Sequence, residues 1–104
     1  MKVLMSDETH EDISSIFEYI SRDSLKYANE TASNIYSCID KLGVSPYLGR
    51  YVLELEDKRY REIIYKSYRI VYTIYQELDM VYIHFVIHGK RNLKSFYKTY
   101  MSKK

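Results

Sequence analysis

The chain has a single cysteine, a single proline, three glycines and no tryptophan. Cys38 cannot form a disulfide within the chain, and a lone thiol is typical of a reducing compartment. Three glycines are too few for a glycine-rich phosphate loop, which excludes nucleotide binding of that kind. No apolar run approaches the roughly 18–20 residues that span a bilayer, and the first residues are too short for a signal peptide. We therefore expect a soluble cytoplasmic protein without a membrane partner.

Metal-binding motifs are also missing. The sequence has no Cys/His cluster, no HExxH and no dense group of carboxylates. We therefore expect no metal site and no cofactor. A length of 104 residues suits one domain with one core, which we assign to residues 1–104.

The two halves of the chain differ in charge. Residues 1–57 hold five Lys and Arg against eleven Asp and Glu, a net charge of −6. Residues 58–104 hold eleven Lys and Arg against three Asp and Glu, a net charge of +8. A basic half of this kind favours an acidic partner, either a nucleic acid or an acidic protein segment, although it is also compatible with a fold whose layers differ in charge.

The first 43 residues predict a short strand and a helix hairpin. Residues 3–5 form the strand, and Ser6 or Asp7 can cap the first helix through its side-chain oxygen. Apolar residues then recur at the i, i+3, i+4, i+7 spacing of one buried helix face, at Ile13, Ile16, Phe17 and Ile20. A second helix is predicted over residues 25–42, with Gly43 as its C-terminal stop.

Beyond the loop marked by Pro46 and Gly49, the apolar pattern changes to a period of two. It predicts strands over residues 50–55, 60–65, 68–75 and 80–88, and a final helix over residues 92–101. The links between the last three strands are short, which requires antiparallel pairing. In the last strand the apolar face that should pack on the hairpin consists of Val81, Ile83, Phe85 and Ile87, and the other face carries Tyr82, His84 and His88. The predicted fold class is α+β, a helix hairpin on a small antiparallel sheet with a short C-terminal helix.

Three segments of the chain carry a family resemblance. They read PYLGRYVLEL at residues 46–55, YREIIYKSYRIVYTIY at residues 60–75 and MVYIHFVIHGKRNL at residues 80–93. Their order and spacing resemble the RelE/ParE toxins of type II toxin–antitoxin systems. The resemblance implies a two-helix hairpin packed on a small antiparallel sheet, which agrees with the periodicity.

The same resemblance implies a growth-arresting toxin with one of two targets. RelE-like members are endoribonucleases that cut mRNA in the ribosomal A site, whereas ParE-like members poison DNA gyrase. Both are neutralised by an antitoxin whose extended segment wraps the toxin. The implied partners are therefore a cognate, acidic antitoxin in a hetero-oligomer, and either DNA gyrase or the ribosome and its mRNA.

Compared with the ribonuclease pattern, Arg69, Arg91 and Tyr97 match its two arginines and its C-terminal tyrosine. Cationic donors there would stabilise the charge that develops when a 2′-hydroxyl attacks the phosphate. The two lysines of that pattern are absent, and Tyr60 and Glu62 stand in their places. The ribonuclease interpretation is supported by the three matches and by the net charge of +8 in residues 58–104. The gyrase interpretation, which we favour, is supported by the missing lysines, the HGKRNL ending and the modest net charge of +2 of the chain. An inactive member that only binds its antitoxin is a third alternative.

Two further residues, Glu62 and His88, are candidates for catalysis beside Arg69, Arg91 and Tyr97. Four cations are candidates for binding. Glu62 could serve as a base or pair with Arg61 or Arg69, and His88 could titrate near neutral pH or be a hydrogen-bonded residue at a strand end. The candidate binding residues are Arg61, Lys90, Lys94 and Lys98.

Overall fold

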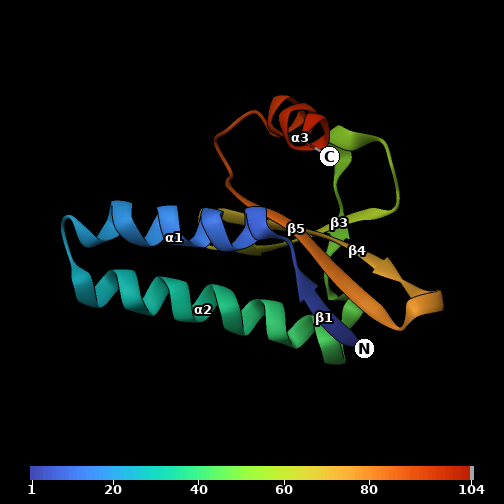
Figure 1. Cartoon of the computed structure of the whole chain (residues 1–104), viewed down its shortest axis with the longest axis horizontal. Helices are drawn as coiled ribbons and strands as arrows, with labels where there is room; N and C mark the ends of the chain where they lie inside the picture. Colours follow the sequence, from blue (N-terminus) through green and yellow to red (C-terminus); the bar gives the residue numbers. More distant parts are fainter. Residues whose placement is uncertain (104) are drawn as a thin grey trace.

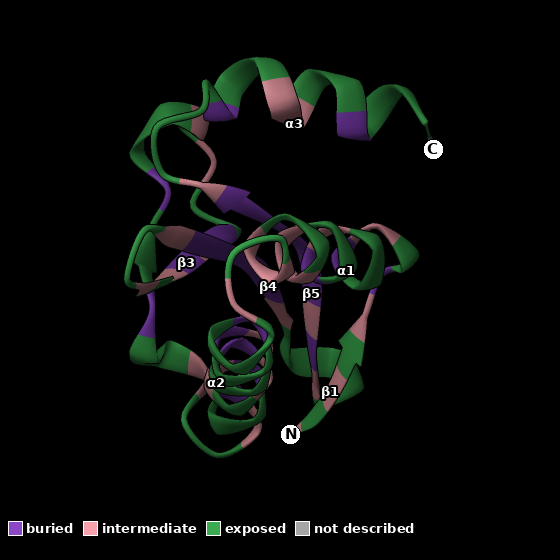
Figure 2. Ribbon diagram, turned by 90° about the vertical axis from the view of Figure 1, so that its left-hand side faces the viewer, coloured by how far each residue is buried: buried purple, intermediate pink, exposed green. Residues whose placement is uncertain are grey.

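The computed structural model describes residues 1–103, and Lys104, the last residue of the predicted domain, lies outside them. Three layers stack on one another, with the helices α1 and α2 on one side of a sheet and α3 on the other (Figures 1 and 2). The helices are α1 (Asp7–Ser21), α2 (Leu25–Val44) and α3 (Leu93–Ser102). The strands are β1 (Lys2–Met5), β2 (Arg50–Tyr51), β3 (Tyr60–Tyr65), β4 (Tyr68–Tyr75) and β5 (Met80–His88).

The sheet has the strand order β1-β5-β4-β3-β2. The pairs β2–β3, β3–β4 and β4–β5 are antiparallel, as the short links require, and the predicted fold class is confirmed. The first strand adds to the sheet edge parallel to β5, with Val3 opposite Val81, so the complete sheet is mixed. A parallel neighbour is possible here because a long connection, made of the helix hairpin and strands β2 to β4, separates β1 from β5 in the sequence. No helix within residues 1–103 combines the length and the apolar content of a membrane span.

The hairpin begins as the sequence predicts. The Ser6 side chain accepts a hydrogen bond from the Thr9 amide and caps α1, and Ser24 caps α2 in the same way. The prediction that Gly43 ends the second helix is wrong, because α2 continues to Val44. A Cβ atom on Gly43 would lie 3.0 Å from the Met1 carbonyl oxygen, so this glycine permits the close approach of the N-terminal strand.

The predicted strand over residues 50–55 is also wrong in its second half. Only Arg50 and Tyr51 pair with β3, and the chain then turns through the 3₁₀ helix Leu53–Leu55. Glu56 follows in the left-handed conformation, with φ of 52°. The alternation of apolar residues is the same in a strand and in this turn, so the pattern could not separate them. The turn carries Glu54 over the face of β3 and β4.

A β-bulge divides the apolar residues of β5 between two cores. Tyr72 pairs with Ile83 whereas the preceding Val71 pairs with Phe85, so His84 is the extra residue. Val81 and Ile83 therefore face the helix hairpin as predicted, but the predicted apolar face changes side after the bulge. Phe85 and Ile87 belong to the second core, under α3, together with Val52, Tyr60, Val71, Leu93 and Tyr100.

Side chains of α1 complete the edge of β5 beyond the end of β1. The Ser6 hydroxyl donates to the His84 carbonyl at 2.6 Å, and the Asp12 carboxylate accepts from the Val86 amide at 2.9 Å. Without these contacts the backbone groups of β5 would lack partners, because β1 stops opposite Ile83. Burial raises the pKa of the Asp12 carboxyl to about 7, although the Val86 amide and the charge of Arg91 favour its ionised form.

Replacement of Asp12 should make stability less dependent on pH. The pKa of Asp12 is higher in the folded state than the ordinary value of 3.8. The protonated carboxyl therefore contributes fully to the free energy of unfolding below about pH 4, and this contribution is lost as the pH rises to about 7. Asp12→Asn keeps an acceptor for Val86 and removes the charge. We expect the stability of the variant relative to wild type to rise across this window by about 1 kcal/mol, allowing for solvent screening.

Urea unfolding at five pH values between 4 and 8 measures this difference. Glu11→Gln, on the exposed side of the same helix, is the control and should show no comparable trend. A difference between Asp12→Asn and wild type that does not change with pH would contradict the prediction.

Candidate functional site

A groove of about 460 Å³ lies on the α3 side of the sheet, beside β2 and the end of the β3–β4 hairpin. Its walls combine apolar side chains with charges of both signs. The lining residues are Arg50, Leu53, Glu54, Glu62, Ile64, Lys66, Ser67, Arg69 and Gly89.

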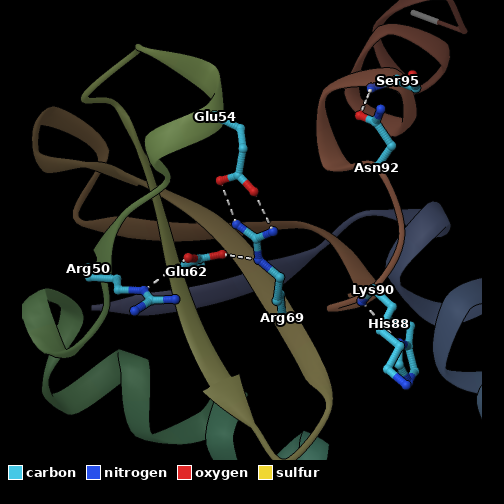
Figure 3. A network of polar contacts seen from close by, with 8 residues as sticks. All are labelled: Arg50, Glu54, Glu62, Arg69, His88, Lys90, Asn92 and Ser95. Atoms are coloured by element: carbon cyan, nitrogen blue, oxygen red, sulfur yellow. Dashed lines mark hydrogen bonds and ion pairs between the residues drawn. The ribbon is translucent and has the colours of Figure 1, made fainter.

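Four of these residues form an ion-pair chain with alternating charges, Arg50–Glu62–Arg69–Glu54 (Figure 3). Arg69 Nε donates to Glu62 Oε1 at 2.5 Å. Its two terminal nitrogens donate to the two oxygens of Glu54, at 2.8 and 2.9 Å. Arg50 Nε donates to the second oxygen of Glu62 at 3.0 Å. This group of four residues is electrically neutral, because its two carboxylates are matched by two guanidinium groups.

Both edges of the Arg69 guanidinium that face these carboxylates are therefore occupied. The hydrogen bonds from Arg69 lower the pKa of Glu54 to about 2, so that Glu54 is ionised at neutral pH. Glu54 in turn raises the pKa of Arg69 above its ordinary value. Of the pairings open to Glu62 in the sequence, the structure selects Arg69 and adds Arg50, but not Arg61. An arginine and a glutamate paired in this way neutralise one another.

Arg61, a predicted binding residue, contacts the loop that precedes β2. Its guanidinium donates to the Gly49 carbonyl at 2.8 Å and lies over the rings of Tyr47 and Tyr51, 5.0 and 4.5 Å from their centroids. Tyr72 holds the other side of this loop. Its buried hydroxyl accepts from the Gly49 amide and donates to the Pro46 carbonyl, both at 2.8 Å. The role of Arg61 in this structure is thus to fix the loop.

The remaining catalytic candidates lie apart from the ion-pair chain. The Tyr97 hydroxyl donates to the Tyr60 hydroxyl at 3.2 Å, and burial raises the pKa of Tyr60 above its usual range. The Arg91 guanidinium lies 4.8 Å from the centroid of the Phe96 ring. Within residues 1–103, no hydrogen bond or ion pair joins Tyr97, Arg91 or His88 to Arg69.

His88 ends β5, and its ring lies to the side of the ion-pair chain in Figure 3. Its Nδ1 accepts from the Lys90 amide at 3.2 Å, and its ring packs edge-on against Tyr68. This is the hydrogen-bonded alternative considered for His88. Among the described residues, no group of three or more His, Cys, Asp or Glu side chains is placed to hold a metal ion.

Three contributors to the site were not among the sequence candidates. Glu54 falls in the predicted strand over residues 50–55, in which it would not reach Arg69. From the sequence, Arg50 is interpreted as structural or antitoxin-facing, and Tyr72 as part of a motif. The available signal is the order of the motifs, because each of these contacts joins residues 46–55 to residues 60–75. The predicted binding residues Lys90, Lys94 and Lys98 are exposed on and just before α3.

Comparison with known proteins identifies a family and several solved structures with a similar fold. Residues 3–93 match the family described as "ParE toxin of type II toxin-antitoxin system, parDE". No curated protein sequence matches the chain. The fold is similar to that in the chromosomal ParDE TA system from P. aeruginosa, with a TM-score of 0.72, 13% identity and coverage of 86% of this chain and 97% of that one. It is also similar to the toxin-antitoxin complex RelBE2 from Mycobacterium tuberculosis, with a TM-score of 0.65, 17% identity and coverage of 84% and 95%.

Breaking the ion-pair chain at its buried member, Arg69, should strongly destabilise the sheet. Arg69→Ala leaves Glu62, of which 2% is exposed, with Arg50 alone, and we expect a loss of about 3–5 kcal/mol in the free energy of unfolding. Arg50→Ala is the matched control, since 70% of its side chain is exposed, and should cost less than about 1 kcal/mol. The double variant Arg69→Met/Glu62→Leu should recover most of the loss, because it removes both buried charges. Urea unfolding tests the three variants, and equal losses for Arg69→Ala and Arg50→Ala would refute this assignment.

Gly49 should not tolerate a side chain. A Cβ atom there would lie 2.5 Å from the Tyr72 hydroxyl and 2.6 Å from the Glu62 carbonyl oxygen, so Gly49→Ala must displace the loop or the sheet. We expect a cost of about 1–3 kcal/mol, which lowers Tm by at least about 4 °C. The control is Gly89→Ala, whose Cβ would meet its nearest neighbour, the Ser67 carbonyl oxygen, at 3.3 Å. Thermal melts that shift equally for the two variants would show that the close approach at Gly49 is not the cause.

Proposed function

Because the chain belongs to the ParE toxin family of type II toxin–antitoxin systems, we propose that it arrests growth by inhibiting DNA gyrase. In this proposal the protein is not an enzyme, and residues 1–104 act as one cytoplasmic domain. Its effect depends on a binding surface rather than on a set of catalytic side chains.

The pairing of Arg69 with two carboxylates is the observation that carries this proposal. A ribonuclease of this fold would need a cation free to stabilise charge on the phosphate, and a group free to move protons. Here the matching arginine and the adjacent glutamate bind each other. The buried Tyr60 hydroxyl, whose pKa is raised, is a poor proton acceptor at neutral pH.

A RelE-like ribonuclease is the second candidate function. It is supported by the exposure of Arg91 and by the similarity to the RelBE2 complex. In that case catalysis would fall to Arg91 and Tyr97, assisted by His88, with Arg69 and Glu62 requiring rearrangement. A third candidate is an inactive member that only binds its antitoxin.

We propose a cognate antitoxin as the partner in a hetero-oligomer, since both similar structures are described as toxin–antitoxin systems. The groove beside the ion-pair chain is a suitable place for an extended, partly acidic segment. Leu53 and Ile64 are 83% and 45% exposed there, and Lys66 and Arg50 stand beside them. Covering those apolar side chains would favour association, and the two cations would favour a segment with carboxylates.

A paired assay separates gyrase inhibition from mRNA cleavage. We expect the purified chain to inhibit supercoiling by gyrase, the antitoxin to reverse the inhibition, and no cleavage in a translation-coupled mRNA assay. Arg91→Ala should inhibit gyrase within about twofold of wild type, whereas a ribonuclease would lose roughly a hundredfold to a thousandfold in cleavage rate with that change. Melting curves confirm that the variant is folded. Cleavage by wild type, lost in Arg91→Ala, would reject the gyrase proposal in favour of the enzyme.

A further inference from the structure

The outward side of α3 carries a row of lysines, which we call the α3 lysine row. It consists of Lys90 in the turn before the helix and Lys94 and Lys98 on it, and all three are exposed. Figure 2 shows α3 with its exposed side turned away from the sheet and from α2. No Asp or Glu occurs in residues 80–104, so no acid on this segment neutralises the row.

Within residues 80–103, the two cations outside the row, Arg91 and Lys103, contact internal partners. Lys103 donates to Glu8 of α1 at 3.2 Å. The Arg91 guanidinium lies over the Phe96 ring and interacts electrostatically with Asp12 of α1. Within the part of the chain that the structure describes, none of the three lysines of the row forms an ion pair. Acidic residues of α1 therefore interact with the cations at the two ends of α3, Arg91 and Lys103, but not with the lysines of the row.

The residues around the row are typical of contact with a phosphate backbone. Lysine, serine and threonine are common donors to phosphate oxygens, whereas lysine is depleted in protein–protein interfaces. Ser95 and Thr99 are exposed beside the lysines, and the one large exposed apolar side chain of α3 is Met101. A protein-binding face would be expected to present aromatic or aliphatic anchors, and those of α3, such as Phe96 and Tyr100, are turned toward the sheet.

The spacing of the row also fits a polyanion. Residues four apart on a helix are separated by about 6 Å along its axis, and one strand of duplex DNA carries a phosphate about every 3.4 Å of axis. Lys94 and Lys98 can thus reach alternate phosphates of one strand, and Lys90, in the turn before the helix, adds a third exposed cation to the same segment.

We infer that the α3 lysine row binds the phosphate backbone of duplex DNA without sequence preference. The choice of DNA rests on the proposed gyrase target, because gyrase holds a DNA duplex beside which the toxin would act. Binding through three phosphate contacts would add to the affinity for gyrase–DNA over gyrase alone, and it would weaken steeply with salt.

Fluorescence anisotropy with a labelled duplex of mixed sequence tests this inference without gyrase, so that its failure is distinct from failure of the proposed function. Three phosphate contacts predict a slope of log affinity against log salt near −2.7, or a loss of about fortyfold between 50 and 200 mM salt. Lys90→Gln/Lys94→Gln/Lys98→Gln should remove this dependence. Lys98→Gln alone should reduce the slope by about 0.9.

The matched control is Lys2→Gln/Lys26→Gln/Lys41→Gln, which changes the net charge equally but alters β1 and α2. It should keep the slope and most of the affinity of wild type, and all variants should melt as wild type does. Equal losses in the two triple variants would reduce the effect to net charge and overturn the inference. It would also be overturned by tighter binding to an RNA of the same length, or by an equal, row-dependent affinity for polyglutamate, which would identify an RNA or an acidic protein instead.

Discussion

The buried guanidinium of Arg69 is the group on which the α3 side of the sheet depends. Only 11% of its side chain is exposed, so its charge must be matched inside the protein. Glu62 supplies one match from β3, and Glu54 supplies the other from the 3₁₀ turn after β2. The requirement to bring Glu54 over the sheet explains why β2 is only two residues long. A longer strand would carry Glu54 along the sheet edge and leave Arg69 with a single carboxylate.

The β-bulge in β5 has a comparable effect on the other parts of the fold. By inserting His84, it turns Phe85 and Ile87 toward α3 and Val86 toward the helix hairpin, so that each helical layer receives apolar side chains from one strand. The extra residue is itself satisfied, with the ring nitrogens of His84 within 2.8 Å of Thr73 Oγ1 and 2.9 Å of the Tyr100 hydroxyl. α3 is therefore attached by a polar contact as well as by apolar packing.

The elements that could be predicted from the sequence are those fixed by local patterns. The helix cap at Ser6, the apolar spacing in α1 and the alternation in β3, β4 and β5 act within a few residues, so the hairpin and the antiparallel strands follow from them. The bulge and the turn at Leu53–Leu55 were missed because each is fixed by a partner far away in the sequence. The contacts of the candidate site were likewise missed where the partner is far away in the sequence. Pairing of Glu62 with Arg69 was one of several local options, but nothing near Glu54 in the sequence indicates that it approaches Arg69.

The charge of the basic half is much reduced by such internal partners. Of its cations, Arg69 is neutralised by two carboxylates, Arg59 by Asp57 and Lys103 by Glu8, so a net charge of +8 overstates what a partner meets.

The residues of the motifs that carry the family resemblance also contact one another inside the protein. Gly49 contacts Arg61 and Tyr72, and Glu62 contacts Arg50 and Arg69, so the first two segments hold each other in place. The third segment pairs with the second through β4 and β5. A set of residues that hold one another in place identifies the fold whatever the protein's target. The resemblance therefore predicts the architecture of this chain well. The mechanism of the protein is better sought in exposed side chains outside that set, such as those of Lys90, Lys94 and Lys98.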